Sequence, residues 1–147
     1  MHETLIIGGG DRTLVNSPEV ITPTQSGGLQ QPRFTDHRGT IERVELEGVK
    51  VNILYTKAGV MRSGDFHPHP QLDILLSGKV ELRTLQNGVH ETREVGPNTL
   101  IVLEPYVPHL FNFLEPTVMM EWWDGPFECH YYKPYRDIID AAAKGSP

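Results

Sequence analysis

The sequence has little of several features that particular protein classes require. Its 147 residues include a single cysteine, Cys129, so no internal disulfide can form and nothing calls for an oxidising compartment. No apolar run approaches the roughly 20 residues that a membrane-spanning helix needs. The net charge is -6, with no block of lysine or arginine. Binding to nucleic acid or to an anionic membrane surface is therefore not expected.

The glycine-rich start of the chain also lacks the pattern of a phosphate-binding loop. Residues 8–10 are all glycine, but no Gly-Lys-Ser/Thr ending follows, and the GxGxxG spacing of a βαβ unit is missing. The apolar run before them, Leu5 to Ile7, is too short for the hydrophobic region of a signal peptide. We expect a cytoplasmic protein with a small-molecule substrate, without nucleic-acid or membrane partners.

Short β-rich runs separated by turn signals make up most of the chain. The strongest turn signal is Asn87-Gly88, which lies between two alternating segments and predicts a hairpin. Many short strands at spacings of about 8 to 12 residues predict an all-β sandwich or small barrel. We expect strands near 41–46, 50–55, 65–76, 79–85, 90–95, 99–103, 110–114, 117–123 and 128–132.

The pattern predicts one domain with an appendage at each end. Residues 1–40 are irregular and are expected to form an N-terminal arm rather than a separate domain, with 41–132 as the barrel. Residues 133–147 contain an Ala-rich run and predict a short C-terminal helix and tail, with Gly145 as a stop. The arm carries β-rich pieces that need a partner edge, which predicts a homodimer.

One segment, GDFHPHPQLDILLSG at 64–78, carries the most chemical information. In a single extended strand, alternate side chains share a face. That face would hold four metal-competent groups, and a further histidine, His109, precedes another apolar strand in PYVPHLFNF. Three imidazoles suit a divalent transition metal ion and leave positions open for water or substrate. The four groups on the strand are His67, His69, Gln71 and Asp73.

An alternative interpretation of the same segment needs no metal. Pro68 and Pro70 cannot donate to a β-ladder, so the histidines between and beside them fit an edge strand or a solvated loop equally well. A histidine beside an apolar run, such as His109, is commonly a hydrogen-bonded core residue. The shared face, the glycine turn at Gly78 and the second histidine segment favour metal binding.

The two histidine segments resemble the two motifs of the cupin superfamily. The first family motif is HxH, three or four residues, Glu, six residues, Gly, and it is similar here to His67, His69 and Gly78. The second is similar to the segment with His109 and, one residue early, Asn112. The resemblance implies an all-β double-stranded β-helix, the cupin jelly-roll barrel, with a three-histidine metal site. Either Gln71 or Asp73 would be the fourth ligand, because both lie on the face of the histidines.

A narrower resemblance concerns sugar-nucleotide cupins, the dTDP-dehydrorhamnose epimerases and dTDP-ketohexose isomerases. FTDHRGTIERV, at 34–44, is similar to their Asp-x-Arg-Gly segment, and Gln71 lies seven residues before Gly78 as in the isomerases. These relatives imply metal-free proton transfer by His67 or His69, with Tyr55 or Tyr132 as acid and arginines holding a diphosphate.

These observations leave three functional hypotheses. The first is a metal-binding cupin, an enzyme of the oxygenase or the isomerase/lyase type, with one divalent ion for which Fe, Zn, Mn and Ni are not distinguished. The second is a metal-independent sugar-nucleotide isomerase or epimerase, and the third a non-catalytic ligand-binding cupin. Glu121 interrupts the apolar run TVMMEWW and is either solvent-facing or an inward acid/base. The candidate catalytic residues are Asp73, Tyr55 and Glu121, and the candidate metal ligands are His67, His69, Gln71 and His109.

Overall fold

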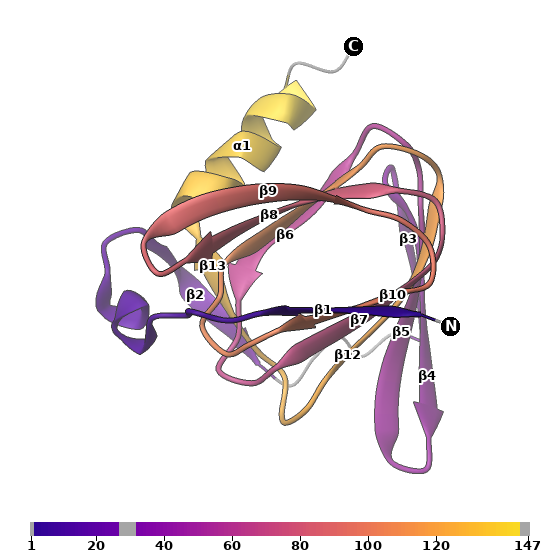
Figure 1. Ribbon diagram of the computed structural model, residues 1–147, viewed down its shortest axis with the longest axis horizontal. Helices are drawn as coiled ribbons and strands as arrows, with labels where there is room; N and C mark the ends of the chain where they lie inside the picture. Colours follow the sequence, from indigo (N-terminus) through magenta and orange to yellow (C-terminus); the bar gives the residue numbers. More distant parts are fainter. Residues whose placement is uncertain (1, 27–31, 145–147) are drawn as a thin grey trace.

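A computed structural model describes residues 2–26 and 32–144, and Gly145 lies outside them. Its strands form two facing sheets (Figure 1). The first sheet has the order β1 (Glu3–Ile7), β10 (Thr99–Leu103), β7 (Gln71–Ser77), β12 (Thr117–Trp123), β5 (Val49–Thr56), β4 (Gly39–Leu46) and β3 (Arg33–Asp36). The second has the order β2 (Val20–Ser26), β13 (Glu128–Tyr132), β6 (Met61–Phe66), β11 (His109–Phe113), β8 (Val80–Gln86) and β9 (Val89–Val95).

Most predicted strands are confirmed to within a few residues, but the strand expected at 65–76 is wrong. The structure divides that segment into β6, which begins at Met61 and ends at Phe66, and β7, which begins at Gln71. Pro68 and Pro70 lie in the connection, where no ladder hydrogen bond is required of them. The hairpin predicted at Asn87-Gly88 joins β8 to β9, and both residues have positive φ, as a type I′ turn requires.

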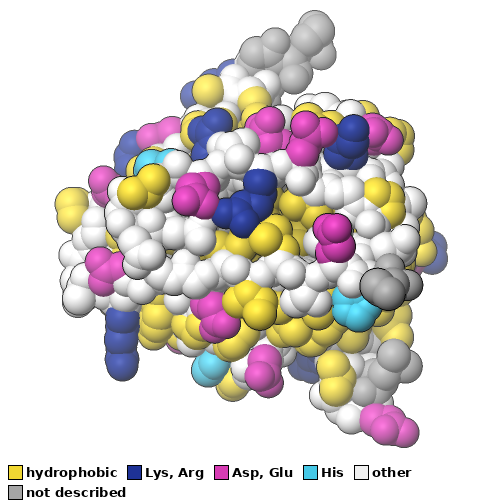
Figure 2. All heavy atoms as spheres, in the orientation of Figure 1, with side chains coloured by type: hydrophobic (Ala, Val, Ile, Leu, Met, Phe, Trp, Pro, Cys, Tyr) yellow, Lys and Arg dark blue, Asp and Glu magenta, His cyan; other side chains and the backbone are white. Residues whose placement is uncertain are grey.

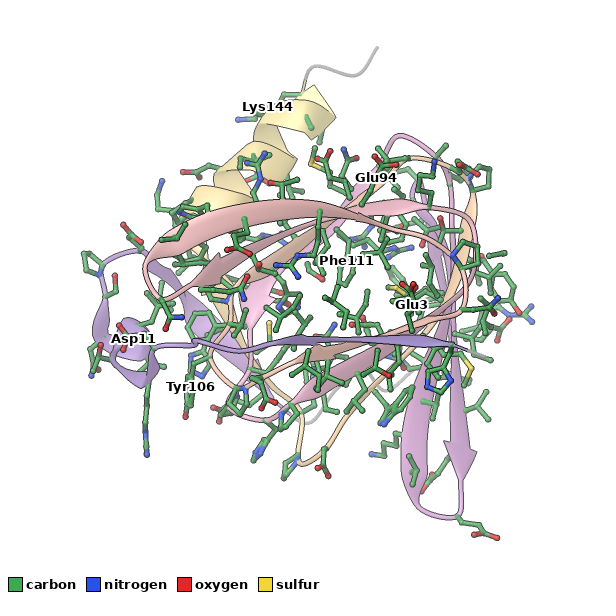
Figure 3. The ribbon with its side chains drawn as sticks, viewed as in Figure 1. Glu3, Asp11, Glu94, Tyr106, Phe111 and Lys144 are labelled. Atoms are coloured by element: carbon green, nitrogen blue, oxygen red, sulfur yellow. The ribbon has the colours of Figure 1, made fainter. Side chains whose placement is uncertain are left out.

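The core lies between the two sheets and comes from the alternating inward side chains of both. Phe111 on β11 is fully buried and points into this space (Figure 3). It packs with aliphatic residues of the facing sheet, such as Leu75 on β7 and Ile101 on β10. Each strand therefore presents one apolar face inward, which is the packing expected of a jelly roll.

A single α-helix, α1 (Lys133–Lys144), covers part of the second sheet among the described residues, and a 3₁₀ turn, η1 (Arg12–Asn16), follows β1. The helix packs on β6 and β13 through a second apolar cluster that includes Tyr135 and Phe66. Over the described residues, no helix lies on the outer face of the seven-stranded sheet (Figure 1). No described helix is long and apolar enough to cross a membrane.

Candidate metal centre

A β-bulge in β6 aims the first residues of the site into the barrel. Arg62 pairs with Phe111 and Asp65 pairs with His109, so two steps along β11 lie opposite three steps along β6. Gly64 is the extra residue, and Ser63 and Gly64 both have positive φ, 80° and 73°. In a regular strand, residues three apart face opposite sides. The bulge lets Arg62 and Asp65 both face inward.

Three side chains from two strands converge at the end of β6. Asp65 is the second-last residue of β6, and His67 comes directly after the last residue of that strand. His109 begins the neighbouring strand β11. Their potential ligand atoms all lie within 4.8 Å of one another. Asp65 Oδ1 is 3.1 Å from His109 Nε2 and 3.6 Å from His67 Nε2. Both imidazoles are almost fully buried.

The other nitrogen of each imidazole, Nδ1, already forms a hydrogen bond with the backbone. His67 Nδ1 donates to the carbonyl oxygen of Glu128 at 2.8 Å, and His109 Nδ1 donates to that of Val107 at 3.0 Å. A carbonyl only accepts, so each Nδ1 carries the proton and each neutral ring turns an Nε2 lone pair toward Asp65. Two lone pairs and a carboxylate oxygen therefore face one another, and such an arrangement requires a cation or an added proton.

Charge interactions within this cluster shift both pKa values. Burial disfavours the charged carboxylate of Asp65, yet the two imidazoles in their positively charged form outweigh burial and hold the pKa of that carboxyl far below its usual value. Burial likewise opposes protonation of His67, but the carboxylate of Asp65 raises the pKa of His67 above its ordinary value of 6.5. The site therefore carries a negative charge on Asp65 and favours a positive charge beside it.

Cys129 on β13 supports the carboxylate from behind. Its Sγ donates to Asp65 Oδ2 at 3.1 Å, which leaves Oδ1 directed at the imidazoles. Burial, and then the charge of Asp65, raise the pKa of this thiol, so it stays protonated as a donor. Cys129 is therefore a buried residue with a polar contact.

A second acidic group lies deeper along the barrel wall. Asp73 on β7 and Glu121 on β12 are directly paired across neighbouring strands. Gln71 Nε2 donates to Asp73 Oδ2 at 3.0 Å and to Glu121 Oε2 at 3.4 Å, and Asn52 Nδ2 reaches Glu121 Oε1 at 3.5 Å. Burial and the charge of Glu121 raise the pKa of Asp73 well above its usual value, so this carboxyl favours its protonated form.

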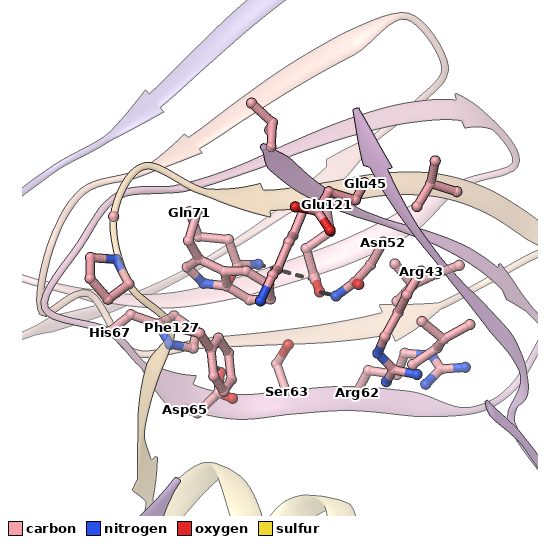
Figure 4. Close-up of a pocket in the computed structure, with 18 of the residues that line it drawn as sticks. Arg43, Glu45, Asn52, Arg62, Ser63, Asp65, His67, Gln71, Glu121 and Phe127 are labelled. Carbon is pink, nitrogen blue, oxygen red and sulfur yellow. Dashed lines mark hydrogen bonds and ion pairs between the residues drawn. The ribbon is translucent and has the colours of Figure 1, made fainter. Parts of the chain in front are cut away.

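One cavity of about 930 Å³ is lined by residues of both clusters, among them Asp65, His67, Gln71 and Glu121. Figure 4 shows His67 and Asp65 at one end of it and Arg43 and Arg62 at the other, with Glu121 on its wall. Aromatic side chains close the histidine end. His67 packs against them at ring-centroid distances of 5.3 and 5.6 Å, which keeps water from that side of the imidazole. They belong to Trp123 and Phe127.

The structure brings together some of the sequence-predicted residues and separates others. His67 and His109 converge, and Gln71, Asp73 and Glu121 all lie inside the barrel beside them. His69 does not join the cluster, because the strand has ended and its ring lies against Gly125 in the loop after β12.

Neither tyrosine considered as an acid lies in this cavity. Tyr55 alternates with inward Leu54 and Thr56, so it points outward and is 47% exposed. Tyr132 is buried in the cluster beneath α1, where burial and the charge of Glu19 raise its pKa to about 12. Their places in the barrel wall keep both side chains away from Asp65, His67 and His109.

Comparisons with known proteins agree on the fold. No family model matches the sequence, and a search of curated proteins finds no match. An oxalate decarboxylase solved to define its substrate binding mode aligns with a TM-score of 0.55 at 16% identity, over 67% of this chain and 30% of its own. Bacillus subtilis oxalate decarboxylase, characterised for its Mn(II) centres, aligns with a TM-score of 0.55 at 15% identity, over 69% and 33%.

A third structure, CapF with the inhibitor 3-isopropenyl-tropolone, aligns with a TM-score of 0.52 at 17% identity, over 63% of this chain and 29% of its own. The chain thus spans about a third of the length of these structures. They have the cupin fold, and the likeness shows that this chain has it too, as its motifs predicted. At these identities the likeness extends to the fold alone.

The cupin spacing also accounts for Asp65, which the sequence analysis missed. If Asp65 and His67 take the two places of HxH, three residues separate His67 from Gln71 and six separate Gln71 from Gly78. Both counts then match the family motif, whereas a start at His67 leaves the strand two residues short. That mismatch was the signal for Asp65. The second family motif has a glycine three residues before its histidine, and Tyr106 stands at that position here with a positive φ of 64°.

Proposed function

We propose that this protein is a metal-binding cupin that acts as an enzyme on a small molecule. One divalent transition metal ion would be held by Asp65, His67 and His109, with Gln71 as a nearby amide oxygen donor. One observation carries the proposal. Asp65 Oδ1, His67 Nε2 and His109 Nε2 are buried, face one another and have no hydrogen-bond partner. Three acceptor atoms without a donor are what a cation site requires.

The donor set fits such an ion. Two imidazoles and one carboxylate form the arrangement typical of non-haem Fe(II) sites, and the same ligand types suit Mn and Zn. When bound, the ion would polarise a substrate oxygen or activate water or dioxygen. The chain's own residues orient the imidazoles through Glu128 and Val107, and the Asp73–Glu121 pair holds a proton near the cavity.

Elemental analysis of the purified protein tests the proposal. Wild-type protein should carry a divalent transition metal near one per chain, and His67→Ala, His109→Ala and Asp65→Asn should each lose most of it. His69→Ala is the matched control, because this histidine lies outside the cluster, and it should retain the metal. The proposal would be contradicted by wild-type protein that contains no metal, or by a metal content that the first three substitutions leave unchanged.

The metal-independent sugar-nucleotide isomerase is a second candidate, and one observation favours it. Arg38 and Arg62 line the same cavity as His67, and Arg38 is held by two hydrogen bonds to Asp36 of the DHRG segment. A dTDP-induced rise in melting temperature in metal-free protein would support this function. A tightly held metal without any response to nucleotide or small-molecule substrates would favour a non-catalytic cupin.

We also propose that the protein is a homodimer that pairs through the outer face of the seven-stranded sheet. Outward apolar residues lie in register on four adjacent strands, Leu100 on β10, Ile74 on β7, Met120 on β12 and Ile53 on β5. Figure 2 shows hydrophobic side chains at the surface in the lower part of the view, below the level of β1 in Figure 1. A second copy would cover this face.

A further inference from the structure

Arg62 is a buried cation that faces the cavity. Its side chain is only 6% exposed. Nε donates to Thr56 Oγ1 at 3.0 Å, and Nη2 is buried without a hydrogen-bond partner. Among the described residues, Arg62 forms no ion pair. A charge held this way is costly unless something pairs with it.

The charges of Asp36 and Glu121 act on Arg62, but each carboxylate is hydrogen-bonded to other side chains. Asp36 is occupied by Arg38, which binds it through Nε and Nη2 at 2.9 and 2.6 Å. Glu121 accepts hydrogen bonds from Gln71 and Asn52 and lies opposite Asp73 on the paired strand. Burial, and then the charge of Arg38, lower the pKa of Arg62 to about 10, so it is still charged near neutral pH. The guanidinium therefore keeps its positive charge and a free donor.

Arg62 faces the same cavity as the proposed metal site. Both Arg62 and His67 line it, and Figure 4 shows Arg62 and Arg43 at the end opposite His67 and Asp65. Arg62 and Asp65 lie opposite Phe111 and His109, which are two residues apart on β11, a span of roughly 7 Å. A single small molecule can therefore reach both ends.

We infer that Arg62 is the anion-binding residue of the substrate site. The substrate class is a small organic acid whose carboxylate or phosphate pairs with the Arg62 guanidinium, while an oxygen at its other end lies beside Asp65, His67 and His109. The unpartnered Nη2 donates a hydrogen bond to the anion, and Thr56 fixes the plane of the guanidinium by accepting from Nε. The position of the second oxygen depends on the proposed metal function, but the binding of the anion by Arg62 does not.

Isothermal titration calorimetry on the purified full chain tests this assignment. Sodium phosphate and sodium succinate are the two anionic probes, and neutral succinamide is the blank. Arg62→Gln should weaken binding of the preferred anion about tenfold or more, because it removes a charge-assisted hydrogen bond. Arg62→Lys keeps the charge but loses the planar guanidinium with its paired donors, so its affinity should lie between those of the wild type and Arg62→Gln. Arg33→Gln removes one exposed arginine outside the cavity and should change nothing.

The outcomes separate this inference from the proposed function. A preference for phosphate identifies a phosphorylated substrate and a preference for succinate a carboxylic acid, and both support the role of Arg62. His109→Ala should lose metal yet still bind phosphate, and Arg62→Gln should lose anion binding yet keep its metal. If neither anion binds, or if Arg62→Gln and Arg62→Lys both bind as the wild type does, the inference is overturned. Arg62-dependent binding in a protein without metal would contradict only the metal function.

Discussion

At the scale of single residues, the thiol of Cys129 sets the direction of a metal-ligand carboxylate. We predict that Cys129→Ala lowers metal affinity by roughly 10-fold to 100-fold, the usual effect of losing a hydrogen bond to a ligand. The cause is the loss of the Sγ–Asp65 Oδ2 contact, after which the carboxylate can rotate. Titration with the metal against a competing chelator measures the change.

Cys129→Ser is the matched control, because a hydroxyl can donate to the same oxygen. It should keep most of the affinity, and equal losses in the two variants would show that Cys129 acts through packing alone. Circular dichroism melts of both variants without metal establish that the fold persists.

The buried carboxyl of Asp73 makes stability depend on pH in a predictable direction. Its pKa is raised above 3.8, so the folded state keeps a proton that the unfolded state loses as pH rises past that value. We predict that Asp73→Asn increases the free energy of unfolding at pH 7, since an amide can donate to Glu121 without any proton uptake. Each unit of raised pKa corresponds to about 1.4 kcal/mol.

Urea unfolding of both proteins at several pH values measures this effect. The gain should be largest at neutral pH and should vanish below about pH 3, where Asp73 is protonated in both states. A variant that is less stable than the wild type at pH 7 would show that the carboxyl is ionised and needed as an anion.

At the scale of elements, the bulge in β6 depends on Gly64 and on α1. A Cβ at Gly64 would lie 2.8 Å from Arg136 Cδ and 3.0 Å from Ile139 Cδ1, and its φ is positive. Arg136 also donates to the carbonyl oxygen of Ser63 at 2.9 Å. The helix therefore stabilises the bulge, and the bulge orients the side chains of Arg62 and Asp65 toward the inside of the barrel.

We predict that Gly64→Ala destabilises the protein by roughly 2–4 kcal/mol and reduces metal binding, because it adds overpacking to backbone strain. Gly88→Ala is the matched control. Gly88 has a similar φ of 77° but nothing within 4 Å of a new Cβ, so it should cost only about 1–2 kcal/mol from strain. Denaturant unfolding and metal analysis of both variants separate the two contributions, and equal costs would exclude a packing role for Gly64.

The same bulge explains how far the sequence could predict the site. Turn residues and alternation are local signals, so eight of the predicted strands and the hairpin at Asn87-Gly88 were confirmed. The position of Asp65 is not local. It depends on a bulge that Arg136 supports from 73 residues away and on a strand that ends before His67. Alternation assumed through 65–76 places Asp65, His67 and His69 on the same face, so it could not show that Asp65, and not His69, joins the cluster.

At the scale of the whole molecule, the two sheets differ in what covers them. α1 packs against the six-stranded sheet, whereas the outer face of the seven-stranded sheet carries only its own side chains among the described residues. Leu76 and Ile6 on that sheet are 46% and 64% exposed. A contiguous apolar face of this kind marks an interaction surface, and a closed symmetric dimer needs only one self-complementary patch.

The proposed dimer can be tested at the centre of this face. We predict that Met120→Lys converts a dimer to a monomer at micromolar concentration, because two buried ammonium groups would face each other across the symmetry axis. Sedimentation velocity measures the mass of each species. Thr92→Lys, on the exposed edge strand β9, adds the same charge elsewhere and should remain dimeric. A monomeric wild type, or equal dissociation of both variants, would contradict a dimer formed through this apolar sheet face.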